Sequence, residues 1–148
     1  MEEILLGDQI IRYDLERTKT AYAGMKTGSA ERCGCRFCRN FVAQRNSIYP
    51  EPFRRLLDQL GIALDKEGDV FELGPVGSGV LYNGWFYLAG ELVRAGERMT
   101  DGGPGLQYFF RSSYRPKALA DFGEEVLALE FSTKLLWVIS EEPDWPTR

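Results

Sequence analysis

The chain has 148 residues, of which 44% are hydrophobic and 27% charged, and its net charge is −4 at pH 7. This composition predicts a single domain, 1–148, with one apolar core, and it excludes extensive disorder because apolar burial can offset the ordering entropy. The acidic balance argues against nucleic-acid binding, and the lack of an apolar run of roughly 18 residues or a basic leader predicts a cytoplasmic protein with no membrane partner.

The N-terminal segment, residues 3–22, mixes apolar and charged positions. Tyr13, Leu15 and Tyr22 give a weak alternation, which predicts one or two short strands. The following stretch, AGMKTGSA, is rich in small and polar residues and is typical of a loop.

Two consecutive helices are predicted next. In residues 35–44 the apolar side chains recur at spacings of three and four, which is the stripe of an amphipathic helix. The second helix begins near Pro50 and Pro52, since proline is tolerated in a first helical turn, and Gly61 is a natural stop. Its apolar positions are Phe53, Leu56, Leu57 and Leu60.

The remainder of the chain reads as a meander of strands. Short aromatic and β-branched runs alternate with glycine and proline, and the predicted strands are VFEL, VLY, WFYLAGELV, LQYFFRSS, EEVLALEF and LLWVIS. Asn83-Gly84 is predicted to form a tight hairpin turn. The sequence therefore predicts an α+β fold, with two consecutive helices packed on a mainly antiparallel sheet of about five or six strands, and a loose C-terminal tail.

The glycine-rich GPVGSGV stretch resembles a phosphate-binding loop only superficially. A strand follows it instead of a helix, and no lysine stands at the position such a loop requires. We interpret it as a glycine-rich hairpin connection.

Side chains for acid-base catalysis are scarce. The chain has no histidine, which excludes hydrolases of the usual triad type. Carboxylates could act as general acids or bases, but their spacing marks no working pair, and surface charge is the simpler interpretation. The candidates considered are Glu72, Glu91, Glu124 and Glu130. No catalytic residue is assigned.

All three cysteines lie in the stretch ERCGCRFCRN, and they permit three interpretations. Thiolates are preferred zinc ligands, and Cys35 and Cys38 can share one helix face while Cys33 reaches across from the preceding loop. The fourth ligand would then be a carboxylate, a water or a group from another molecule, because histidine is lacking. Iron-sulfur clusters usually require four cysteines.

The second interpretation of the cluster is redox chemistry. Neighbouring arginines and a helix N-terminus would stabilise a thiolate, although the strand-first setting of dithiol oxidoreductases is not evident. The third is that the cysteines are reduced structural thiols, since an odd number so closely spaced suits a reducing compartment.

Charge and aromatic residues are unevenly distributed. Residues 31–55 carry six arginines against two glutamates, a local charge of +4, whereas residues 56–148 carry eight bases against fifteen acids, a local charge of −7. Pairing between these regions is the simplest interpretation of the arginines. About half of the aromatics should enter the core. The candidate partner-binding residues are Arg36, Arg39, Tyr82 and Trp85, and the second aromatic cluster is Tyr108, Phe109, Phe110 and Tyr114.

Four stretches carry a resemblance to a protein family: CGCRFCRNF, YPEPFRRLLDQLGI, LDKEGDVFELG and LYNGWFYLAGEL. Over roughly residues 31–93 the chain resembles an uncharacterised family of small bacterial proteins with a CxCxxCxNF segment and a downstream Gly-Trp hairpin. The resemblance implies a bacterial cytosolic origin and adds no catalytic assignment.

The leading hypothesis is a non-enzymatic binding protein with a protein partner, such as a toxin or defence protein that it neutralises, and with a cysteine cluster that binds zinc. The alternative is a redox or metal enzyme, or a sensor, that uses Cys33, Cys35 and Cys38 directly.

Overall fold

The computed structural model describes residues 1–113 and 122–145, and within them the chain forms four helices and a seven-stranded antiparallel sheet. Tyr114 and the last three residues of the predicted tail lie outside this part. The elements are β1 (Glu2–Leu6), β2 (Gln9–Tyr13), α1 (Leu15–Ala23), α2 (Ser29–Cys33), α3 (Arg36–Ile48), α4 (Glu51–Leu60), β3 (Asp69–Val76), β4 (Gly79–Arg94), β5 (Thr100–Asp101), β6 (Leu106–Ser113) and β7 (Val126–Leu136).

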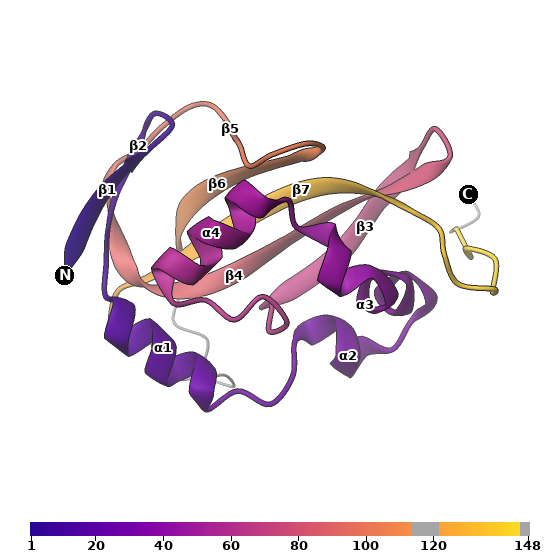
Figure 1. Cartoon of the computed structure of the whole chain (residues 1–148), viewed down its shortest axis with the longest axis horizontal. Helices are drawn as coiled ribbons and strands as arrows, with labels where there is room; N and C mark the ends of the chain where they lie inside the picture. Colours follow the sequence, from indigo (N-terminus) through magenta and orange to yellow (C-terminus); the bar gives the residue numbers. More distant parts are fainter. Residues whose placement is uncertain (114–121, 146–148) are drawn as a thin grey trace.

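The sheet is organised around the long strand β4. The strand order is β1-β2-β4-β7-β6-β5, and β3 also pairs with β4. β7 pairs with one edge of β4 from Gly79 to Ala89, whereas the other edge is shared between β3 near its start and β2 near its end. α4 lies across one face of the sheet (Figure 1), so the domain has a helix layer on a sheet layer.

Between the segment of β4 that pairs with β3 and the segment that pairs with β2, one edge of β4 has no neighbouring strand among the described residues. Side chains of α1 form hydrogen bonds with the backbone there. The Thr18 hydroxyl accepts a hydrogen bond from the Ala89 N–H at 3.0 Å, and the Tyr22 hydroxyl donates to the Tyr87 carbonyl at 2.6 Å. Two hydroxyls therefore take the place of a missing strand, since buried backbone groups need partners.

Aromatic rings fill the space between helices and sheet. Phe131 of β7 contacts the rings of Phe41 in α3, Phe53 in α4 and Phe86 in β4, with centroids 5.6 to 6.4 Å apart. All four side chains are fully buried. Burial of each stabilises the fold by about 1.5–3 kcal/mol.

Both predicted helices are confirmed. Cys35 is the N-cap of α3, and α4 follows Pro50 with Pro52 in its first turn. Gly61 ends α4 with a φ of 79°, a left-handed conformation that glycine adopts at little cost, and its N–H donates to the Asp58 carbonyl.

The N-terminal prediction was correct for two strands and wrong for the segment after them. β1 and β2 form a hairpin, but Leu15 to Tyr22 belong to α1. Asp14 caps this helix by accepting a hydrogen bond from the Arg17 N–H at 3.0 Å. The weak alternation concealed this cap, and it also concealed the helical spacing of buried Thr18, Ala21 and Tyr22. A further short helix, α2, begins inside the predicted AGMKTGSA loop.

The predicted turn at Asn83-Gly84 is wrong, because β4 runs straight through these residues. Gly84 pairs with Val70 and Phe131, and a Cβ there would lie 2.7 Å from the Asp69 carbonyl oxygen and from the Phe131 ring. Close packing between strands, rather than a positive φ, therefore requires this glycine. The hairpin turn lies at Gly77-Ser78, within the predicted glycine-rich connection, and Gly77 has a φ of 59°.

The number of strands also differs from the prediction of five or six. VLY and WFYLAGELV are one strand, and EEVLALEF joins the first residues of LLWVIS in β7. The separate β1 and β2 and the two-residue β5 raise the number to seven in the described part of the chain. None of the described helices has the length and apolar character needed to cross a membrane.

Candidate metal centre

The three cysteines lie at the junction of α2 and α3. Cys33 is the last residue of α2, Cys35 caps α3, and Cys38 lies in the first turn of α3. Gly34 between the helices has a φ of 69°, which lets the chain reverse direction there. The three Sγ atoms all lie within 4.8 Å of one another, so the cluster can hold a metal ion.

The three thiols differ in exposure and in acidity. Cys33 and Cys35 are exposed, whereas Cys38 is buried. The pKa of Cys33 is lowered, first by a backbone hydrogen bond from Cys35 and then by hydrogen bonds with the other two cysteine side chains. Burial raises the pKa of Cys38. The Cys33 thiol is therefore more acidic than an ordinary cysteine thiol, whereas a bound cation would favour the thiolate of Cys38 against the effect of burial.

A backbone hydrogen bond also holds the Cys35 side chain. The Cys38 N–H donates to Cys35 Sγ at 3.4 Å, which orients this sulfur over the first turn of α3. Hydrogen bonds of this kind orient the ligands of metal sites.

Arg36 and Arg39 flank the cysteines but are bound within the chain. Both guanidinium groups pair with Glu141, with Arg36 Nε at 3.2 Å and Arg39 Nη2 at 3.0 Å from Oε2. Arg39 Nε also donates to the Gly34 carbonyl at 3.1 Å. Pairing of these arginines with an acid of the C-terminal region agrees with the simplest interpretation of the charge pattern. They remain partly exposed, so the surface beside the cysteines is cationic.

A buried ion pair holds α2 against α3. Arg45 of α3 pairs with Glu31 of α2 and donates to Glu67 Oε1 at 2.9 Å. Glu67 in turn accepts hydrogen bonds from the Ser29 N–H and the Ala30 N–H, both at 3.1 Å. This network fixes the helix that carries Cys33 relative to the helix that carries Cys38. Sequence reasoning missed it, because charge runs do not reveal which arginine is buried.

Glycine at position 28 makes room for this network. A Cβ there would lie 2.5 Å from Glu67 Oε1. Burial raises the pKa of Glu67, and the Arg45 guanidinium acts in the opposite direction. Glu67 is fully buried, so its ionised form depends on Arg45.

The C-terminal segment covers the first turn of α3. The rings of Trp137 and Trp145 contact Phe37, with centroids 5.5 and 4.7 Å away. Asn40 of α3 donates to the Leu136 carbonyl at 3.1 Å and accepts from the Val138 N–H at 2.8 Å. Contacts with the C-terminal segment and contacts with the sheet therefore both fix the residues between Cys35 and Asn40.

The four predicted partner-binding residues do not form one surface. Tyr82 is fully buried, and its hydroxyl donates to the Phe37 carbonyl at 2.8 Å and accepts from Asn40 at 3.2 Å, so it supports α3 instead of facing solvent. Trp85 is half-buried and points to the opposite face of β4, with its ring centroid 6.1 Å from that of Phe71. Only Arg36 and Arg39 lie beside the cysteines.

Two of the four carboxylates considered for catalysis pair with arginine. Glu91 accepts a hydrogen bond from Arg12, and Glu130 accepts one from Arg111, each at 2.8 Å. Glu124 is exposed, which also agrees with the interpretation as surface charge. Glu72 is half-buried on β3 like Glu91 and Glu130, but no described arginine pairs with it.

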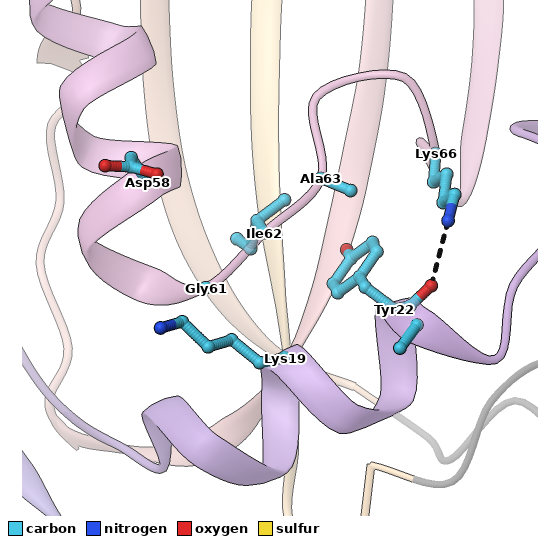
Figure 2. Close-up of a pocket in the computed structure, with 8 residues that line it drawn as sticks. Lys19, Tyr22, Asp58, Gly61, Ile62, Ala63 and Lys66 are labelled. Atoms are coloured by element: carbon cyan, nitrogen blue, oxygen red, sulfur yellow. Dashed lines mark hydrogen bonds between the residues drawn. The ribbon is translucent and has the colours of Figure 1, made fainter.

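A small open pocket lies between the C-terminal ends of α1 and α4, apart from the cysteines (Figure 2). Its volume is about 290 Å³, and Lys66 on its rim donates to the Tyr22 carbonyl at 3.0 Å. Lys19 and Asp58 also line it. Its two lysines and single carboxylate do not form a set of metal ligands, so the cysteine cluster is the stronger candidate site.

Comparison of the chain with protein-family models, with curated proteins and with solved structures found no match. The geometry of the cysteine cluster is therefore the basis for a proposed function.

Proposed function

We propose that this protein binds one zinc ion through Cys33, Cys35 and Cys38, and that it acts as a non-enzymatic binding protein. The observation that carries the proposal is the mutual approach of the three Sγ atoms to within 4.8 Å. Ligand atoms in a tetrahedral zinc-thiolate site, with Zn–S bonds of about 2.3 Å, lie at comparable separations.

The donor set favours zinc over other biological metals. Three sulfur donors are too soft for magnesium or calcium, which select oxygen ligands. An iron-sulfur cluster usually needs a fourth cysteine, and the chain has only three. Zinc also takes an oxygen ligand in its fourth position.

A metal at this position would add a second link between α2 and α3, which the Arg45–Glu31 ion pair already holds together. Zinc would tie the end of α2 to the start of α3, beside the cationic side chains of Arg36 and Arg39. We infer that this surface contacts an acidic patch on a protein partner, since exposed guanidinium groups pair well with carboxylates. Neutralisation of a toxin or defence protein is a role that suits such a binding protein.

The direct test is native mass spectrometry with elemental analysis of protein purified without a metal-affinity column. We expect about one zinc per chain in the wild type and loss of the metal in Cys35→Ser. Ser78→Ala, in the distant β3–β4 turn, should retain the metal and serves as the control. A wild-type chain with three free thiols and no metal would overturn the proposal.

The second candidate function is thiol redox chemistry, favoured by the lowered pKa of Cys33 and by the exposure of Cys33 and Cys35. Alkylation rates with and without a chelator distinguish the two functions. Zinc-bound thiolates should resist alkylation until the chelator is added. A redox site should react quickly in both conditions.

A further inference from the structure

We propose that Glu72 of β3 supplies the fourth ligand and closes the metal centre as a three-sulfur, one-oxygen site. This assignment rests on the proposed zinc binding by the cysteines. The cluster needs a fourth ligand of another kind, because the chain has no histidine and no fourth cysteine.

The strand register directs Glu72 toward the helices that carry the cysteines. Glu72 pairs with Tyr82 across the β3–β4 ladder, and directly paired residues project to the same face of a sheet. Tyr82 projects toward α3, where its hydroxyl donates to the carbonyl of Phe37, the residue before Cys38. α2 and α3 both contact β3, and Figure 1 shows them beside that strand.

The charge of Glu72 also bears on the groups around the cluster. It acts to raise the pKa of Cys33, against the hydrogen bonds that lower it, and it contributes to the raised pKa of Tyr82. These effects support the placement that the strand register and the contacts of α2 and α3 with β3 give to Glu72.

Glu72 is also a half-buried carboxylate without a compensating partner. Within residues 1–113 and 122–145, its side chain makes no hydrogen bond or ion pair, in contrast to Glu67, Glu91, Glu130 and Glu141, which all bind arginine. Its carboxylate oxygens are therefore available to accept a cation.

The backbone around Glu72 is irregular in a way that suits a ligand. The β3–β4 register shifts between Glu72 and Gly74, and Gly74 has a φ of 155°. Such a bulge bends the strand and re-aims the adjacent side chain, and bulges are frequent next to functional sites. The shift begins after the regular Glu72–Tyr82 pair, so Glu72 is the last regularly paired residue before the bulge.

The bonds, protons and charges of the proposed site can all be accounted for. Zinc would form three Zn–S bonds and one Zn–O bond, and protons held by the cysteine thiols would be released to solvent. Three thiolates, one carboxylate and Zn²⁺ leave a net charge of −2 on the site. Arg36 and Arg39 lie next to it, and with their shared partner Glu141 they contribute a net charge of +1 that offsets part of this charge.

The test compares metal binding by the wild type, Glu72→Gln, Glu72→Cys and the control Glu97→Gln, in which the exposed carboxylate lies in the β4–β5 connection. Zinc affinity is measured by competition with a chelating dye, and Co²⁺ replaces zinc as a spectroscopic probe. We expect Glu72→Gln to weaken zinc binding by about 10-fold or more. Glu97→Gln should match the wild type.

Glu72→Cys should add a sulfur ligand to the metal, and a merely structural role for Glu72 cannot produce this effect. A fourth thiolate should strengthen the sulfur-to-cobalt charge-transfer band by about one third, in proportion to the number of sulfur ligands, and keep the metal tetrahedral. Glu72→Gln should instead change the cobalt ligand-field bands. Circular dichroism of the metal-free chains checks that all variants fold.

The failure of this inference is distinguishable from the failure of the proposed function. If the wild type binds zinc and both Glu72 variants give its affinity and cobalt spectrum, the fourth ligand is another group and the assignment of Glu72 is overturned. If the wild type itself binds no zinc, both proposals are overturned.

Discussion

The helix layer is attached to the sheet in two different ways along its length. Under α4, the contact is apolar, with Phe53 against Phe131 and three buried leucines beside it. Under α2 and α3, apolar packing such as that of Phe41 on Phe131 is joined by directional groups: the Arg45–Glu67 pair, the Asn40 hydrogen bonds and the cysteine cluster. Apolar packing is insensitive to pH and metal, whereas ion pairs and thiolates respond to both. The cysteine end is therefore the part of the molecule whose stability solution conditions can change.

The largest effect is expected for the aromatic packing around Phe131. Phe131→Ala removes a fully buried ring that contacts four other rings, and we expect a loss of about 4 kcal/mol in the free energy of unfolding. Urea denaturation measures the loss. The folded fraction should still bind zinc normally. Reduced affinity per folded molecule would show that the two ends are coupled.

The buried ion pair should give the next largest effect. Arg45→Ala leaves Glu67 buried without its cation, and we expect a loss of about 3 kcal/mol near neutral pH. Arg111→Ala breaks a pair with Glu130 at the surface and should cost at most about 1 kcal/mol. Equal losses in the two variants would contradict the assignment of Arg45 to a buried support.

The Arg45 variant should also depend on pH in a definite direction. The pKa of Glu67 is raised in the folded state, so its protonated form favours folding. This contribution to stability is present below the pKa of the unfolded chain, and it is lost as pH rises through the pKa of the folded chain. Without Arg45 the pKa of Glu67 should rise further. Urea titrations from pH 4.5 upward should therefore show the gap between variant and wild type widening, and a constant gap would refute this explanation.

Removal of metal should act on the cysteine end alone. If free zinc is held at 100 times its dissociation constant, binding stabilises the folded state by about 2.7 kcal/mol, and excess chelator should remove that contribution. Thermal melting with and without chelator measures the shift. Cys38→Ala should melt at the same temperature in both conditions. A chelator effect that persists in this variant would indicate a metal elsewhere.

The smallest effect is expected for the C-terminal cover. Trp145→Ala removes a partly buried ring 4.7 Å from Phe37, and we expect a loss of about 1 kcal/mol with faster alkylation of Cys38. Trp85→Ala, on the opposite face of the sheet, should not alter cysteine reactivity. An unchanged alkylation rate in Trp145→Ala would show that the cover does not protect the thiol.

Sequence reasoning succeeded where structure is locally encoded. The spacing of Cys38, Phe41 and Val42 predicts α3, and Gly61 marks the end of α4, because helix periodicity and caps depend on nearby residues. The approach of the cysteines could also be expected from their spacing before a helix.

It failed where a residue's role depends on a distant part of the chain. Asn83-Gly84 has the local form of a hairpin turn, but Gly84 is required by the Phe131 ring on another strand. In the same way, Arg45 is one of six arginines in its region, and only the fold pairs it with Glu67. The placement of Glu72 on the sheet face that α3 covers likewise arises from the pairing of β3 with β4 and from the packing of α2 and α3 on β3.

The side chains of α1 that satisfy the middle of β4 have a consequence for aggregation. An unpaired strand edge is a template to which another chain can add, and here Thr18 and Tyr22 occupy it through their hydroxyls. While α1 is docked, intermolecular strand addition at the centre of the sheet is blocked. Detachment of α1 would uncover that edge even if every strand stayed paired as before. Docking of one short helix, rather than assembly of the sheet, is therefore the step that keeps this edge from self-association.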